Sequence, residues 1–188
     1  MQIKIKHCLF CLLLITNTIA LSQEGNLVLD KRHQLGIGIS KFLNNIFPSD
    51  NNAFLLEYRY LYKEKNAYRL GGDYRTETSS DGLYEIGVKV GIDRTFRKNN
   101  RWFFYYGIDF GGRYLYYIDR EQSLTNITLN PFFGIQYHLS ENFSISTEPG
   151  LFFRYNFSKE ERSFSEKNKS WIESRLAKIG VIQVNFHF

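Results

Sequence analysis

Cysteine is nearly absent from this 188-residue chain, because its 2 cysteines, Cys8 and Cys11, both lie close to the N-terminus. The rest of the chain therefore offers no disulfide, no thiol nucleophile and no cysteine metal site. Proline and methionine are scarce as well, with 3 and 1 residues, whereas 13 Tyr and 17 Phe help to bring the aromatic content to 17%. This composition favours strands over helices.

Long apolar runs and a large charge excess are also missing. The mean hydropathy is -0.34, and no stretch beyond the N-terminal segment is apolar enough for a membrane helix. If the chain enters a membrane, it must do so as a closed barrel, since only helices and closed barrels satisfy the backbone in lipid. The net charge is +5, and subtracting Lys4 and Lys6 of the N-terminal segment leaves 5 − 2 = +3. An excess this small and scattered does not indicate a nucleic-acid partner.

The N-terminus has the pattern of a secretory signal peptide. Lys4 and Lys6 give a basic start, an apolar run follows over 8–15, and small residues at Ala20 and Ser22 suit cleavage before Gln23. The sequence thus predicts a signal peptide over 1–22 and one mature domain over 23–188. An uncleaved membrane anchor is the alternative, although the apolar run is short for a span. A lipoprotein is disfavoured because Cys11 lies inside the apolar core rather than after it.

Apolar and polar residues alternate along most of the mature chain, which is the pattern of strands. In one segment, Ile127, Leu129, Phe133 and Ile135 fall on one face, while Thr128 lies on the other. Eight such segments are predicted, at 34–41, 54–60, 68–75, 84–93, 102–116, 126–139, 143–157 and 171–188. The even number is that of bacterial single-chain barrels.

The connections between these segments alternate in length. Tight turns are expected at 63–66, 97–100 and 140–142, and longer connections at 43–52, 77–82 and 158–170, with 119–123 only slightly longer than a turn. Outer-membrane barrels have short periplasmic turns and longer external loops. The pattern therefore predicts that both termini and the tight turns face the periplasm.

The polar face carries matched numbers of acids and bases. The seven acids are Glu57, Asp73, Glu85, Asp93, Asp109, Glu148 and Glu173, and the seven bases are Arg59, Arg69, Arg75, Lys89, Arg113, Arg154 and Arg175. Nine glycines alternate among them, at 36, 38, 71, 87, 91, 107, 111, 134 and 150. Glycine weakens a strand, but it makes room for long ionic side chains in a narrow interior. A soluble lipocalin-like barrel, which would bury its apolar face instead, is the competing architecture.

These charges predict a lumen filled by a paired ionic network. Unpaired charges are costly in a low dielectric, and the equal numbers allow pairing. We expect Glu148 to pair with Arg154 or Arg175. A narrow path for ions or protons is the alternative. On the apolar face, Arg94 and Lys178 break the pattern near an expected membrane interface, where long side chains can extend to water.

The chain ends in Val184-Asn185-Phe186-His187-Phe188, with a terminal aromatic residue after alternating apolar positions. This ending resembles the C-terminal signal of bacterial outer-membrane proteins, and the whole mature chain resembles the small OmpA-type and OmpX-type barrels. The resemblance implies an all-β, eight-stranded, up-and-down transmembrane barrel in the outer membrane of a Gram-negative cell. It also implies contact with outer-membrane lipid and lipopolysaccharide, and with periplasmic chaperones and the barrel-assembly machinery, with Val184, Phe186 and Phe188 as the assembly signal. It implies no specific activity, because fold does not determine function.

Three classes of function remain open from the sequence. The first is a structural or surface-interaction barrel, with the mixed-charge loop at 158–170 as a contact surface. The second is an accessory subunit bound to another envelope protein in a transport or secretion complex. The third is a lipid-modifying enzyme, for which His138, Ser140 and Glu148 are the candidates, although Ser140 falls in a turn and no G-x-S-x-G is present. His33, His138 and His187 are expected to be too dispersed for a metal site, and no cofactor is predicted.

Overall fold

The structure is a computed structural model that describes residues 31–39, 54–63, 65–77, 82–119, 121–160, 167–176 and 182–188. Strands occupy most of these residues: β1 His33–Gly38, β2 Leu56–Tyr62, β3 Asn66–Glu77, β4 Leu83–Asn99, β5 Trp102–Tyr117, β6 Gln122–His138, β7 Phe143–Thr147, β8 Leu151–Glu160, β9 Lys167–Leu176 and β10 Ile182–His187. No helix within the described ranges is long and apolar enough to cross a membrane. The predicted signal peptide, the connection at 43–52 and Lys178 lie outside the described residues.

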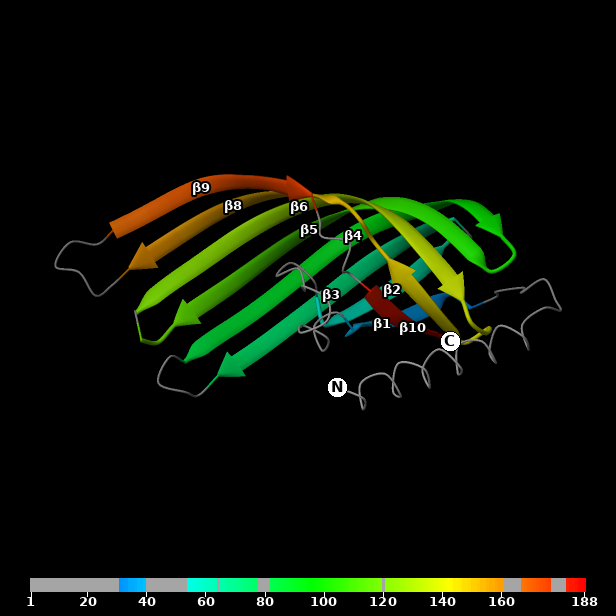
Figure 1. Cartoon of the computed structure of the whole chain (residues 1–188), viewed down its shortest axis with the longest axis horizontal. Helices are drawn as coiled ribbons and strands as arrows, with labels where there is room; N and C mark the ends of the chain where they lie inside the picture. Colours follow the sequence, from blue (N-terminus) through cyan, green and yellow to red (C-terminus); the bar gives the residue numbers. More distant parts are fainter. Residues whose placement is uncertain are drawn as a thin grey trace, which may run out of the picture.

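The strands form one antiparallel sheet that closes on itself. Its order is β5-β4-β3-β2-β1-β10-β7-β6-β8-β9, and β5 also pairs with β6. Figure 1 shows the long strands β3, β4, β5, β6, β8 and β9 side by side, and β1, β2 and β10 (blue, cyan and red) together where the sheet closes. Because β6 pairs with both β7 and β8, and these pair with β10 and β9, the ten segments make eight strands. The prediction of an eight-stranded antiparallel barrel is therefore confirmed for the described part of the chain.

The seventh strand is interrupted without losing register. Along β6, Gln136 pairs with Ser146 of β7 and Leu129 pairs with Phe153 of β8, so no residue is inserted between the two segments. The ladder is broken at Pro149, which has no N–H to donate but accepts a bond from the Phe133 amide at 2.9 Å. The predicted single strand at 143–157 thus becomes two ladder segments that keep the same inward and outward faces.

Between its two paired segments, the eighth strand has two residues more than the seventh strand has. β8 pairs Leu151 with Leu176, whereas β7 pairs Thr147 with Ile182. Four positions therefore separate the residues on the seventh strand, and six separate those on the eighth. Because side chains alternate with a period of two, an even insertion leaves the inward face inward on both sides of the break.

One predicted turn is wrong, because β4 contains a one-residue β-bulge and continues past the expected turn. The sequence suggested a turn at 97–100, but β4 continues to Asn99, and the turn is Asn100-Arg101. The β4–β5 register shifts between Thr95 and Arg97, so the extra residue is Phe96. An extra residue exchanges the two faces of a strand beyond it.

Both described termini and the tight turns lie at one end of the barrel, which we call the turn end. His33 and Phe188 exchange backbone hydrogen bonds of 3.0 and 3.1 Å. Backbone bonds also connect His138 with Arg101 and His187 with Asn142 there. The turn end comprises residues 31–33, 188 and the turns at 63–65, 100–101 and 139–142.

The interior is polar and the exterior is apolar. In β4, Ile86 and Val88 are 53% and 59% exposed, whereas Glu85 and Lys89 are each 8% exposed. The same inversion holds around the described barrel, where only five hydrophobic residues are buried: Ala67, Leu83, Tyr105, Phe132 and Phe152. The charged lumen is therefore the candidate functional site.

Candidate functional site

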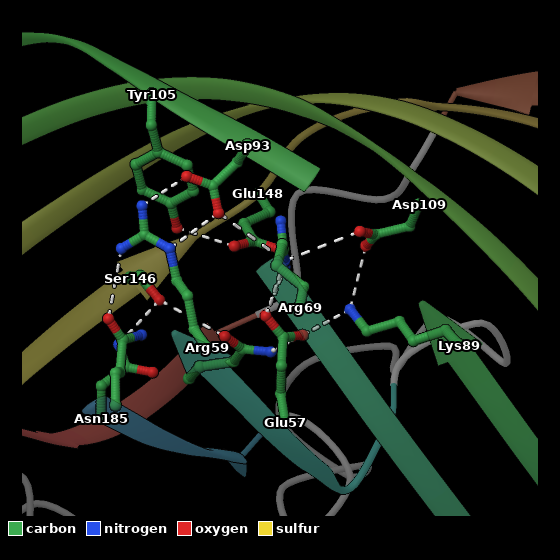
Figure 2. A network of polar contacts seen from close by, with 12 residues as sticks. Glu57, Arg59, Arg69, Lys89, Asp93, Tyr105, Asp109, Ser146, Glu148 and Asn185 are labelled. Carbon is green, nitrogen blue, oxygen red and sulfur yellow. Dashed lines mark hydrogen bonds and ion pairs between the residues drawn. The ribbon is translucent and has the colours of Figure 1, made fainter. Parts of the chain in front are cut away.

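Ten of the fourteen charged residues predicted for the lumen are buried. They project inward from β2, β3, β4 and β5 and from the Glu148 position between β7 and β8, because alternate side chains of a strand share a face. The ten are Glu57, Arg59, Arg69, Asp73, Glu85, Lys89, Asp93, Asp109, Arg113 and Glu148. Figure 2 shows seven of them meeting in one network.

Arg69 of β3 lies at the centre of this network. Its guanidinium forms an ion pair with Glu57 and another with Glu148 at 2.5 Å, and it lies 3.6 Å from Asp109. Its charged carbon is also 4.1 Å from the centre of the Phe132 ring. One arginine thus neutralises carboxylates that the chain brings in from three separate parts of the barrel wall.

Arg59 and Asp93 form a two-pronged ion pair beside Arg69. Their paired atoms lie 2.7 Å (Nε–Oδ2) and 2.5 Å (Nη2–Oδ1) apart. Such bidentate pairs fix orientation as well as charge. Arg59 also lies 4.6 Å over the Tyr105 ring, and the Tyr105 hydroxyl donates a 2.7 Å bond to Glu148.

Lys89 completes the network by contacting Glu57 and, at 3.0 Å, Asp109. The cluster of Glu57, Arg59, Arg69, Lys89, Asp93, Asp109 and Glu148 is called the central cluster below. Three cations face four carboxylates there, and Arg69 and Lys89 each contact more than one of them. Further from the turn end, Arg113 binds Asp73 at 3.2 Å and Glu85 at 2.8 Å.

The remaining predicted members lie at the edge of the lumen or outside it. Arg75 is wrongly placed by the sequence argument: its side chain is 56% exposed and pairs with Glu77 of the same strand. Glu173 lies 3.7 Å from Arg154 and 3.1 Å from Arg175, and all three are partly exposed. The expected pairing of Glu148 with Arg154 or Arg175 is also wrong, since Glu148 binds Arg69.

Glycines make room for these bulky side chains. A Cβ on Gly134 would overlap the Tyr105 ring, and one on Gly71 would lie 2.6 Å from Lys89 Cγ. A Cβ on Gly107 would lie 2.5 Å from Phe132. The lumen is filled closely enough that a methyl group at any of these glycines has no place without movement of a neighbour.

The described part of the lumen contains small hollows, of which two are well defined. One of about 40 Å³ is lined by Lys89, Asp109, Arg113 and Phe152 among others, and one of about 30 Å³ lies toward the turn end beside Arg59 and His138. Each can hold a few water molecules.

A neutral polar layer lies between the central cluster and the turn end, and the sequence argument gave it no role. Gln136 donates to Ser144 Oγ at 2.7 Å, and His187 Nε2 lies 2.8 Å from the same oxygen. Asn185 donates to Ser146 Oγ at 2.9 Å. The alternation had placed these residues on the polar face, which was the available indication.

Two histidines meet in this layer, contrary to the expectation that they are dispersed. The rings of His138 and His187 are 4.8 Å apart, and His138 also packs 4.4 Å from Phe103. His33 lies elsewhere, with its Nδ1 2.6 Å from the Tyr58 hydroxyl. Among the described residues, no group of three or more His, Cys, Asp or Glu is arranged to hold a metal ion.

The candidate catalytic residues each have other partners. Ser140 Oγ accepts bonds from the amides of Asn142 and Phe143 within its turn. Glu148 is held by Arg69 and Tyr105, and His138 lies against Phe103 and His187. In these positions the three side chains do not form a nucleophile–base–acid arrangement.

The C-terminal aromatic residues lie on the outward face. Phe186 and Phe188 are exposed, Phe186 packs 5.3 Å from Phe143, and the Phe188 ring lies 5.5 Å from His33. Val184 pairs with Ile145 of β7 on the same face.

Comparison of the chain with protein-family models, with curated proteins and with solved structures gave no match.

Proposed function

We propose that the protein is a small integral outer-membrane barrel with a plugged, charge-paired lumen, which acts as a structural or surface-interaction protein through its external loops. The observation that carries this proposal is the inversion along β4. Ile86, Val88, Val90 and Ile92 are exposed, while Glu85, Lys89 and Asp93 are buried.

An inverted barrel suits hydrocarbon better than water. Soluble monomers seldom expose contiguous apolar patches larger than a few hundred Å². Here the outward residues of β3, β4, β5 and β6 form such a surface, which includes Leu70, Phe110, Ile127 and Leu129. In this proposal a bilayer covers it, and the pairing of β1 with β10 joins the first and last strands, as a barrel in lipid requires.

A lumen filled by paired charges favours a structural role over transport. Eight strands enclose a space that side chains just fill. The central cluster, Tyr105 and Phe132 occupy it, and the hollows of about 40 and 30 Å³ are smaller than a sugar. The proposal therefore assigns the interaction surface to the connections opposite the turn end, with an envelope protein or lipopolysaccharide as partner. The predicted loop at 158–170 is shorter than expected, because β8 continues to Glu160 and β9 begins at Lys167.

Cell fractionation and gel mobility test the membrane part of the proposal. The full chain expressed in a Gram-negative host should be recovered with the outer membrane and, if unboiled, should migrate differently on a detergent gel from a boiled sample. A closed barrel resists unfolding by the detergent, which causes the difference. Recovery as a soluble periplasmic protein, or identical migration of both samples, would contradict the proposal.

A liposome assay tests the plugged lumen. Liposomes that carry the purified barrel should take up radiolabelled sucrose no faster than protein-free liposomes. A general porin in parallel liposomes is the positive control. Rapid uptake through the wild-type protein would overturn the plugged state while leaving the membrane location intact.

A further inference from the structure

The outward face near the turn end carries a groove with mostly apolar walls. The groove has a volume of about 530 Å³ and is lined by Tyr68, Ile92 and Ile108, with the small residues Ala67 and Gly107 between them and Arg94 at its edge. Ala67 and Gly107 face the lumen, so the groove lies between two outward cross-strand rows of side chains, Asn66–Arg94–Tyr106 and Tyr68–Ile92–Ile108. A groove of this volume with mostly apolar walls can hold part of a hydrocarbon chain.

A basic hollow adjoins this groove on the side of the turn end. It has a volume of about 250 Å³ and is lined by Lys65, Thr95, Phe96, Arg97 and Lys98. Arg94 and Thr95 are successive residues of β4, and Lys65 immediately precedes β3, so the two hollows follow the same pair of strands. An apolar groove with a cationic hollow next to it along the same strands combines the two features of an amphipathic site.

The β-bulge creates this combination. Phe96 is the inserted residue, and its ring lies about 6 Å from each of the rings of Phe104, Tyr106 and Phe133 on the outward face. Arg97 follows Phe96 and pairs with Phe104 of β5, whose side chain lies on the outward face. Arg97 therefore lies on the outward face as well. The bulge therefore sets the outward Phe96 ring directly beside the exposed Arg97.

Arg94 of the groove and Arg97 of the hollow differ from the arginines of the lumen in their partners. No described carboxylate forms an ion pair with Arg94 or Arg97, whereas the lumen arginines at 59, 69 and 113 each bind one or more acids. By sequence, the turn end has Glu64 and Glu141 against five cations, Lys31, Arg32, Lys63, Lys65 and Arg101, and β4 adds Arg94, Arg97 and Lys98 next to it.

We propose that the groove and the basic hollow form a binding site for one anionic glycerophospholipid, such as phosphatidylglycerol, of the periplasm-facing leaflet. Arg94 and Arg97 bind the phosphodiester, since guanidinium groups match phosphate oxygens in geometry and charge. One acyl chain lies in the groove between Tyr68, Ile92 and Ile108. The inference rests on the proposed membrane location, because the leaflet is set by the turn end facing the periplasm.

Native mass spectrometry of the purified barrel tests this site. The mature protein is held in detergent, its fold is checked by gel mobility, and dioleoylphosphatidylglycerol or dioleoylphosphatidylcholine is added in equal amounts. We expect one phosphatidylglycerol to remain bound to the wild type at lipid concentrations where phosphatidylcholine does not. The choline ammonium competes with the arginines for the phosphate, which accounts for the preference.

Two variants separate the headgroup from the acyl part of the site. Arg94→Gln with Arg97→Gln should weaken phosphatidylglycerol binding roughly thirtyfold, because two basic residues near the lipid phosphate are lost. Ile108→Trp should fill the groove and weaken binding without any change of charge. Arg101→Gln is the matched control, since it removes a turn-end cation that lines neither hollow, and it should bind as the wild type does.

The outcomes distinguish this inference from the proposed function. A barrel that inserts into membranes and shifts on the gel but binds both lipids equally would overturn the lipid site alone. Equal losses in the Arg101 control and in the double variant would show attraction by surface charge and would overturn it as well. Failure to insert or to shift on the gel would instead refute the membrane proposal.

Discussion

Replacing Arg69 by methionine should be the most damaging single change in the lumen. Methionine keeps much of the length of the side chain but removes the charge that contacts Glu57, Glu148 and Asp109. The central cluster then has two cations for four carboxylates. Removing one partner of a buried ion pair typically costs about 3–5 kcal/mol, so we expect the free energy of unfolding to fall by at least about 3 kcal/mol.

The same strand offers a matched control. Arg75 follows Arg69 on the same face of β3, but it is exposed, and its partner among the described residues is Glu77. Exposed ion pairs contribute about 0–1 kcal/mol, so Arg75→Met should leave stability within about 1 kcal/mol of the wild type. Urea titration in lipid vesicles measures both variants through the fluorescence of Trp102 and Trp171.

A second substitution tests whether charge causes the loss. Glu148→Gln removes one of the carboxylates that Arg69→Met leaves without its cation, so the double variant should recover part of the stability, with a coupling of about 1–3 kcal/mol. If Arg69→Met were no less stable than Arg75→Met, the central cluster would not hold the barrel together. Additive effects of the two lumen substitutions would show that Arg69 acts by packing rather than by charge.

Three further predictions concern packing, assembly and burial of the polar layer. Gly134→Ala should destabilise the barrel by about 1–3 kcal/mol in the same titration because its methyl group would overlap the Tyr105 ring, whereas Gly72→Ala, with nothing within 4 Å of the added atom, should not; equal stabilities would contradict the close filling of the lumen. Deletion of Phe188 should lower the amount of protein in the outer membrane and increase its degradation in the periplasm, as shown by immunoblots of cell fractions, and normal levels would refute its part in assembly. Ser144→Val should cost about 1–3 kcal/mol, since it leaves a buried donor on a neighbouring side chain without its acceptor, and an unchanged urea midpoint would show that water replaces the lost bond.

The sequence was sufficient to predict which side chains share a face, because the period of two survives local irregularities. Pro149 interrupts the seventh strand but inserts nothing, and the eighth strand gains an even number of residues, so neither event exchanges the faces. The bulge at Phe96 is the exception. Its single extra residue lies among charged residues that resemble a turn, and no periodic pattern distinguishes a turn there from a strand that continues past a bulge.

Pairing partners were less predictable than faces. Glu148 was expected to bind a base near its own hairpin, yet it binds Arg69, which lies far away in sequence. The meeting of His138 and His187 has the same origin. Partners across a lumen depend on the stagger of all eight strands, and alternation along one strand contains no information about that stagger.

Arg75 shows a related limit. By alternation along the strand it falls on the inward face, but it lies near the end of β3, where its side chain is exposed. Alternation along a strand gives the direction of a side chain, whereas its burial also depends on how far the neighbouring strands extend.

The closure between β1 and β10 has a consequence for how the chain folds. Gln34 pairs with His187, so the first and last strands must meet before the barrel is complete. Contacts between residues so distant in sequence make folding slow, because the ordering entropy is lost before the contact forms. The outward apolar strands would remain uncovered throughout that delay, and uncovered strand edges aggregate. The topology therefore requires that the newly made chain be kept unfolded and shielded until its last residue is available for pairing.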